Sequence, residues 1–96
     1  MKKQRGRNNK YPETIETWRL GEKVPSWLSN VCAVKEVDGR NGDMKLDIRE
    51  TDEGYELIAS GVNQILVKVS SKEDYICFGD SRVFSLTPKQ IELLYD

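Results

Sequence analysis

Residues 65–95 read ILVKV, SSKE, DYICFG, DS, RVFSL and TPKQIELLY, and this stretch decides the fold class. Three apolar runs, ILVKV, DYICF and RVFSL, alternate with short polar segments. Short runs of β-branched and aromatic residues bounded by turn residues are typical of antiparallel strands. We therefore predict three consecutive strands at 65–69, 74–78 and 82–86.

The last nine residues of this stretch have the signature of a capped helix. The Thr87 hydroxyl can accept from the Gln90 backbone N–H while the Gln90 side chain reaches back, which is a capping box. Pro88 occupies the first helical position, where its missing N–H costs nothing. A helix this short is not stable alone, so it must dock on the sheet through its apolar face (Ile91, Leu94 and Tyr95).

The preceding residues add further strands and one helix. Residues 44–49 alternate apolar and charged side chains, and residues 55–59 return with an apolar face, as half-buried strands do. Residues 11–21 favour a strand, with a helix as the alternative, and residues 35–43 hold two turn dipeptides. Pro25 suits the start of a short helix over residues 24–31. The prediction is an α+β fold: a small, strongly curved antiparallel sheet or partial barrel of five to six short strands, with helices at 24–31 and 88–95.

Charge divides the chain unequally, although its net charge is only -1. The first ten residues hold five basic residues and no acid, whereas residues 11–96 hold ten basic and sixteen acidic residues. At 96 residues the chain has room for one core. We expect a flexible basic arm over residues 1–10, followed by a single domain over residues 11–96.

The cysteine and histidine content limits the catalytic and metal-binding roles that this chain can have. The two cysteines, Cys32 and Cys77, are expected to be free, buried thiols in a reducing cytoplasm, because neither a secretory signal nor a membrane-length apolar run occurs. The chain has no histidine, which is the commonest general base and a frequent metal ligand. We predict no catalytic residues, no metal and no cofactor.

Three groups of residues are candidates for binding. Five carboxylates between residues 47 and 56 could form an acidic surface that contacts a partner protein (Asp47, Glu50, Asp52, Glu53 and Glu56). Aromatic and arginine side chains could form a ligand pocket, because rings stack on bases and guanidinium groups bind phosphate (Trp18, Arg19, Tyr75 and Arg82). The basic arm could contact nucleic acid (Lys2, Lys3, Arg5, Arg7 and Lys10). Solvated charges and core aromatics are the simpler explanation for all three groups.

Several short motifs, taken in order, resemble a family of small phage and prophage proteins of unassigned function. They are Lys10-Tyr11-Pro12, the WRLG of residues 18–21, the PSWL of residues 25–28, the strand at 44–48, Asp74-Tyr75-Ile76, and the closing helix that ends in Tyr95. Glu73 replaces the glycine usual in that family, and Phe78-Gly79-Asp80 replaces a usual isoleucine, basic residue and glycine.

The resemblance implies a phage-encoded accessory protein in the cytoplasm of a bacterial host, with no catalytic residues to carry over. Our leading hypothesis is a non-enzymatic antidefence or host-takeover inhibitor that binds a host protein, with the acidic surface mimicking nucleic acid. One alternative is a sponge that sequesters a nucleotide signal in the aromatic pocket. A further alternative is nucleic-acid binding through the basic arm.

Overall fold

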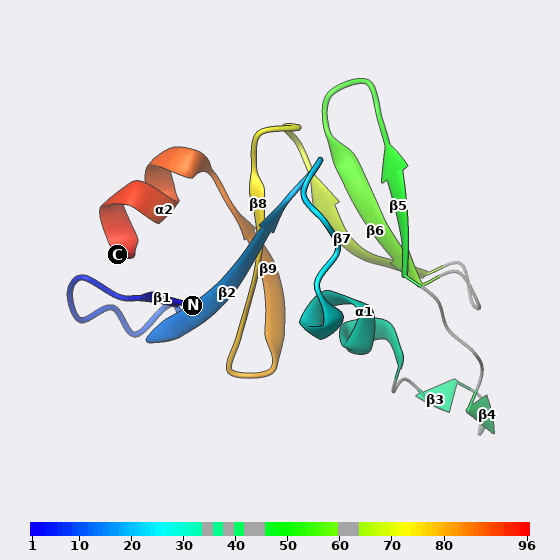
Figure 1. Cartoon of the computed structure of the whole chain (residues 1–96), viewed down its shortest axis with the longest axis horizontal. Helices are drawn as coiled ribbons and strands as arrows, with labels where there is room; N and C mark the ends of the chain where they lie inside the picture. The colour runs from blue at the N-terminus through cyan, green and yellow to red at the C-terminus, as the bar shows by residue number, and fades with distance from the viewer. Residues whose placement is uncertain (34–35, 38–39, 42–45, 60–63) are drawn as a thin grey trace. The chain divides into compact units, whose positions relative to one another are not determined.

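The computed structural model describes residues 1–33, 36–37, 40–41, 46–59 and 64–96. The chain forms two compact units (Figure 1), one made of Met1–Glu22 and Lys72–Asp96 and the other of Lys23–Ser71. Each unit is described by itself. The expectation of one domain over residues 11–96 stays a prediction.

The first unit is a four-stranded antiparallel sheet with one helix. The strand order is β1-β2-β8-β9, with β1 at Lys2–Lys3, β2 at Thr14–Arg19, β8 at Tyr75–Gly79 and β9 at Arg82–Leu86. Helix α2 (Pro88–Leu94) packs on one face of this sheet (Figure 1). The core between them is apolar (Ile15, Cys77, Leu86, Ile91 and Tyr95).

The start of α2 confirms the predicted capping box. The Gln90 backbone N–H donates to the Thr87 hydroxyl at 3.1 Å, and the Thr87 N–H donates to the Gln90 side-chain oxygen at 2.9 Å. The helix ends one residue earlier than predicted, because Tyr95 adopts an extended backbone with φ −132° and ψ 150°. That conformation allows Tyr95 to form a β-bridge with Gln4.

The first ten residues differ from the expected flexible arm. Strand β1 pairs with β2, with Lys2 opposite Ile15 and Lys3 opposite Thr14. The Arg5 N–H donates to the Leu94 carbonyl at 2.9 Å, and the Asp96 N–H donates to the Lys3 carbonyl at 2.8 Å. Backbone hydrogen bonds therefore order this segment without apolar side chains, which is why its composition suggested a solvated arm.

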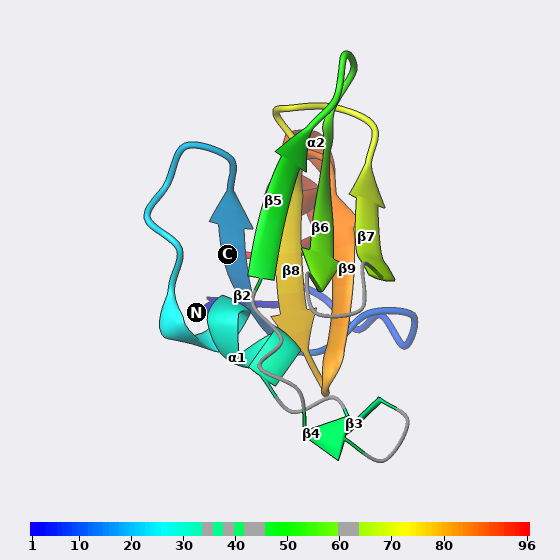
Figure 2. The same ribbon diagram turned by 90° about the vertical axis from the view of Figure 1, so that its right-hand side faces the viewer.

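The second unit is a three-stranded antiparallel sheet with a helix and a short ribbon. Helix α1 is Ser26–Ala33, two residues later than predicted, and the ribbon pairs β3 (Glu36–Val37) with β4 (Arg40–Asn41) inside the expected loop at 35–43. The sheet order is β5-β6-β7 (Figure 2), with β5 at Leu46–Glu50, β6 at Tyr55–Ala59 and β7 at Gln64–Val69. Met44, Lys45 and the Asp38-Gly39 turn lie outside the described residues.

Gly54 is required where the turn enters β6. A Cβ atom there would overlap the Val69 carbonyl oxygen, and it would lie 2.8 Å from the Ser71 backbone nitrogen. The following residue, Tyr55, is fully buried, as are Leu57 and Ala59 two and four positions later. This alternation is the one predicted for β6.

The prediction of one strongly curved sheet or partial barrel is wrong. The structure has an α+β composition, but it contains separate four-stranded and three-stranded sheets, and neither is closed or strongly curved. The strands at 55–59 and 82–86 lie as predicted, and β2 confirms the strand preferred over a helix within residues 11–21. The error lies in pairing, since β8 pairs with the distant β2 rather than continuing the meander from β7.

Tyr95 joins the two ends of the chain to the core of the first unit. Its side chain is buried, and its hydroxyl donates a 2.7 Å hydrogen bond to the Pro12 carbonyl. A buried acceptor that loses its donor retains the cost of its desolvation.

We expect Tyr95→Phe to lower the free energy of unfolding by about 1 to 2 kcal/mol, because the ring remains while the Pro12 carbonyl loses its partner. Urea denaturation followed by fluorescence measures this change. Leu93→Ala is the matched control on the same helix, because Leu93 is 65% exposed, and a surface truncation should stay within about 0.5 kcal/mol of wild type. Equal stability of Tyr95→Phe and wild type would contradict the assigned role.

Candidate ligand-binding site

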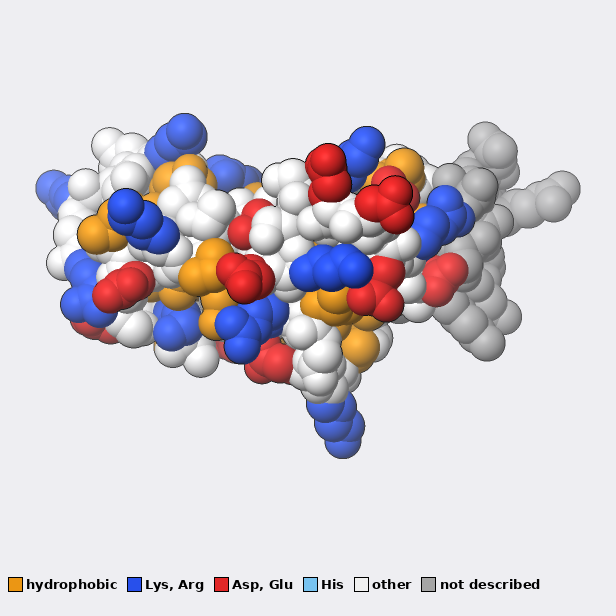
Figure 3. Space-filling model, turned by 90° about the horizontal axis from the view of Figure 1, so that it is seen from above, with side chains coloured by type: hydrophobic (Ala, Val, Ile, Leu, Met, Phe, Trp, Pro, Cys, Tyr) orange, Lys and Arg blue, Asp and Glu red, His pale blue; other side chains and the backbone are white. Residues whose placement is uncertain are grey.

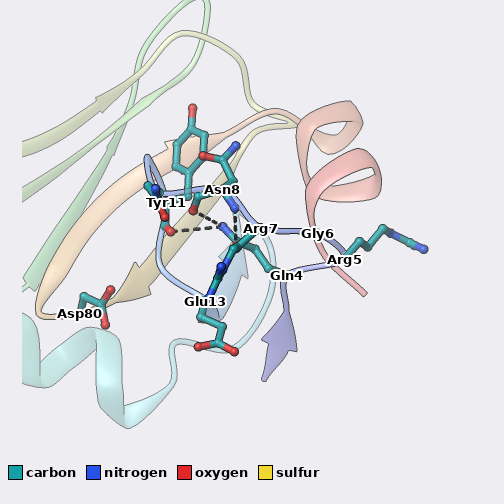
Figure 4. A pocket seen from close by; sticks show the side chains of 9 residues that line it. Gln4, Arg5, Gly6, Arg7, Asn8, Tyr11, Glu13 and Asp80 are labelled. Carbon is teal, nitrogen blue, oxygen red and sulfur yellow. Dashed lines mark hydrogen bonds between the residues drawn. The ribbon is translucent and has the colours of Figure 1, made fainter.

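A polar pocket of about 610 Å³ lies at the loop that joins β1 to β2 (Figure 4). Most of its wall comes from this loop, and one residue comes from the turn between β8 and β9. All of its residues belong to the first unit. The lining consists of Gln4, Arg5, Gly6, Arg7, Asn8, Asn9, Tyr11, Glu13 and Asp80.

One amide side chain holds the loop in shape. The Gln4 Nε2 donates to the carbonyls of Asn8 at 3.0 Å and Tyr11 at 3.2 Å, and its Oε1 accepts from the Asn8 N–H at 3.2 Å (Figure 4). The Asn8 side-chain oxygen then accepts from the Lys10 N–H at 2.9 Å, a local turn that asparagine favours. The loop is therefore ordered from inside by polar contacts that satisfy its backbone.

Arg5 is directed away from the pocket towards the end of α2 (Figure 4). Its Nε donates to the carbonyls of Glu92 and Tyr95, both at 3.0 Å, and its Nη1 lies 2.9 Å from an Asp96 carboxylate oxygen. A guanidinium at this position satisfies the last carbonyls of the helix and complements its dipole. Arg5 thus serves the fold, although it was predicted to contact nucleic acid.

Arg7 differs from Arg5, because its guanidinium forms no hydrogen bond or ion pair with any residue in the described parts of the chain. It is exposed on the loop and lines the pocket. A guanidinium with no protein partner can bind a carboxylate or phosphate through two parallel hydrogen bonds. Arg7 is therefore the cation that this site offers to a ligand.

Asp80 reaches the pocket from the β8–β9 turn, with its carboxylate directed towards the loop (Figure 4). Asp80 and Ser81 both have positive φ, at 49° and 60°, as the central residues of a type I′ hairpin do. The turn is held close to the start of β2, because a Cβ on Gly79 would lie 2.6 Å from the Thr14 carbonyl oxygen. The position of Asp80 is therefore set by backbone packing.

Two cations lie over aromatic rings beside the pocket. The Lys10 Nζ is 5.6 Å from the centroid of the Tyr11 ring, and the Arg82 guanidinium carbon is 5.5 Å from that of Phe84. The two rings are stacked, with centroids 5.8 Å apart. These contacts hold both charges beside the loop, where they add positive potential.

The four residues predicted to form an aromatic pocket do not form one site. Arg19 lies over the Tyr75 ring at 5.2 Å, so this pair comes together as expected. Trp18 is only 2% exposed, its indole N–H donates to the Glu22 carbonyl at 3.1 Å, and strand alternation places it on the opposite face. Arg82 pairs with Gly79 at the far end of the β8–β9 hairpin from Tyr75.

Two of the five carboxylates of the predicted acidic surface, Asp47 and Glu56, lie on strands apart from the other three, and Figure 3 shows acidic and basic side chains interspersed on one face. Glu56 lies between Arg49 and Lys68 in the strand register, so its charge is flanked by opposite charges. Asp47 is exposed on β5. The exposed Glu50, Asp52 and Glu53 gather around the β5–β6 turn.

The basic residues predicted as an arm also separate. Lys2 and Lys3 lie on β1, and Arg5 contacts α2. Arg7 lines the pocket, and Lys10 lies over the ring of Tyr11, a lining residue. Sequence reasoning missed Gln4, Asn8 and Asp80, because their roles depend on the fold of the loop and on the pairing of β8 with β2. The Asn8-Asn9 pair was a turn signal that could have indicated a structured loop.

Cys77 is a buried free thiol, and burial raises its pKa to about 12. Such a thiol is not a nucleophile at neutral pH. The described residues hold no cluster of three or more His, Cys, Asp or Glu side chains placed to bind a metal. The Cys32 side chain lies outside the described residues.

In a Cys32→Ser background, we expect Cys77 to resist Ellman's reagent at pH 8 and to react fully in urea, since only unfolding exposes the thiolate. Burial also raises the Tyr95 pKa. The Cys77 thiol and the Tyr95 hydroxyl are neutral in the folded state. Their raised pKa values stabilise the fold fully at pH values below the pKa that each group has in the unfolded chain, and this stabilisation is lost as pH rises. The urea midpoint should therefore fall with pH above about 9, towards the folded Cys77 pKa of about 12. Immediate labelling of the native thiol would contradict the burial of Cys77.

Within the described residues, no helix has the length and apolar character needed to cross a membrane. Searches of protein-family models, of curated proteins and of solved structures found no match to this chain.

Proposed function

We propose that this protein is a small non-enzymatic binding module that takes up a phosphate-bearing nucleotide in the pocket at the β1–β2 loop. The observation that carries the proposal is the Arg7 guanidinium, which lines this pocket and has no partner among the described residues. Arginine suits phosphate because its planar group donates two parallel hydrogen bonds.

The pocket has the size and the order that such a ligand needs. Its volume of about 610 Å³ falls within the roughly 300–1,000 Å³ typical of small-molecule sites. The Gln4 hydrogen bonds order the loop before any ligand arrives, which reduces the entropy that binding must overcome. The Asn9 amide on the pocket wall supplies a further donor and acceptor.

Charge also supports an anionic ligand at the first unit. This unit carries nine basic and eight acidic residues, whereas Lys23–Ser71 carries six basic and eight acidic residues. Lys10 and Arg82, held over aromatic rings, add positive charge near Arg7. The excess of acidic residues that disfavours a phosphate ligand thus belongs to the other unit.

The biological role that we propose is that of a phage-type accessory protein acting in a bacterial cytoplasm, as a sponge that removes a nucleotide signal. Its support is the resemblance of the motif order to small phage proteins together with the pocket. A nucleic-acid strand presents the same phosphate groups as a free nucleotide. The test must therefore distinguish binding of a mononucleotide from binding of a strand.

We expect Arg7→Gln to weaken binding of nucleoside monophosphates by about tenfold, because one charge-assisted pair is lost. Isothermal titration calorimetry with the full chain measures this against Lys89→Gln, which removes an exposed cation from α2 outside the pocket. A ten-nucleotide single strand is titrated in parallel. Binding of the strand without binding of mononucleotides would assign the site to nucleic acid. No binding of either, or no effect of Arg7→Gln, would refute the proposal.

A second candidate function is binding of a host protein through the acidic side chains of the β5–β6 hairpin. The observation in its favour is the gathering of the exposed Glu50, Asp52 and Glu53 around one turn. A localised acidic tip can steer a basic partner surface and select it by charge.

Neutralising the five carboxylates of the hairpin region should abolish recovery of a specific partner from bacterial lysate, and neutralising only Glu50, Asp52 and Glu53 should be nearly as effective. Quantitative mass spectrometry of the captured proteins provides the measurement. Arg7→Gln is the control that should leave this recovery unchanged. Equal recovery by wild type and the neutralised variants would exclude the acidic contact.

A further inference from the structure

The residues that line the pocket carry charges of both signs. Arg7 supplies a cation from the loop, while Asp80 and Glu13 supply carboxylates from the β8–β9 turn and from the residue before β2 (Figure 4). A ligand that carries only negative charge would be attracted by Arg7 and repelled by the carboxylates. The ligand that fits this arrangement has a phosphate at one end and hydrogen-bond donors at the other.

Asp80 is the carboxylate placed to meet those donors. Its side chain has no hydrogen-bond or ion-pair partner among the residues that the structure describes, and it is directed towards the loop. An ionised carboxylate is an acceptor only, so it requires N–H or O–H groups from the ligand. The turn keeps Asp80 at φ 49° followed by Ser81 at φ 60°, positions where asparagine, aspartate and glycine are the usual residues.

Guanine matches a carboxylate better than the other bases. Its N1–H and 2-amino group are adjacent donors that can bind both carboxylate oxygens at once, in the way a guanidinium does. The corresponding edge of adenine presents the N1 lone pair, which a carboxylate repels. Uracil and thymine present one N–H between two carbonyls, and cytosine presents one amine beside an acceptor nitrogen.

We propose that the ligand of this pocket is a guanine nucleotide, with Asp80 binding the Watson–Crick edge of the base and Arg7 binding the phosphate. This assignment rests on the proposed nucleotide-binding function and adds the identity of the base. Discrimination follows because adenine would place the N1 lone pair, in place of two N–H donors, against the Asp80 carboxylate.

The test titrates GMP, IMP, AMP and 2′-deoxy-GMP into wild type and Asp80→Asn by calorimetry. Wild type should bind GMP at least about tenfold more tightly than AMP, since two hydrogen bonds to a charged group are at stake. IMP, which keeps N1–H but lacks the 2-amino group, should lie between them. The deoxynucleotide should bind as tightly as GMP, because the base and not the ribose is recognised.

Asp80→Asn should lose about tenfold or more of its GMP affinity, whereas its AMP affinity should not fall, because the carboxylate that repels adenine N1 is removed. Asparagine tolerates positive φ as well as aspartate does, so the turn is retained, and an unchanged melting temperature confirms folding. Glu92→Gln, on an exposed carboxylate of α2 outside the pocket, is the charge control and should bind all four ligands as wild type does.

Two results would overturn the guanine assignment while leaving the phosphate site intact. One is equal affinity of wild type for GMP and AMP with both still dependent on Arg7. The other is an equal loss of both nucleotides in Asp80→Asn, which would show a general electrostatic or structural effect. Absence of binding by any nucleotide would overturn both this inference and the proposed function.

Discussion

The buried Tyr95 side chain is the contact on which the first unit depends. Its ring belongs to the core under α2, its hydroxyl donates to the Pro12 carbonyl, and its backbone forms a bridge with Gln4. One residue therefore connects the closing helix, the entry to β2 and the N-terminal segment. The extended backbone at Tyr95 is what ends α2 and turns the final residues towards β1.

This attachment explains how a polar, basic segment becomes a site. The loop between β1 and β2 is held at its first residues by Lys3, Gln4 and Arg5, through hydrogen bonds with Asp96, Glu13 and the end of α2. Its middle is held by the Gln4 amide. Two cations that look equivalent in sequence consequently have different roles. The Arg5 side chain binds the carbonyls at the end of α2, whereas Arg7 lines the pocket.

Distribution of charge over the two units changes the expected partner. An average over residues 11–96 is acidic, and it suggested a mimic of nucleic acid. In the structure, however, the carboxylates of the second unit alternate with Arg49 and Lys68 along paired strands, except at the tip of the hairpin. The first unit combines, in the lining of one pocket, a carboxylate with an arginine that has no partner among the described residues. A mixed-charge pocket selects a ligand with two chemical ends, which a uniform patch cannot do.

The sequence by itself determined the local elements, because these depend on short-range patterns: the Thr87-Pro88-Gln90 cap, the strands at 55–59 and 82–86, and the β8–β9 turn. It also located the basic and acidic segments. Only the tertiary structure decided that β8 pairs with β2, that the four-stranded and three-stranded sheets are separate, and that Asp80 reaches the loop of Arg7. These outcomes depend on hydrogen bonds between residues more than fifty positions apart, and no local periodicity or propensity specifies which edges of the strands will meet.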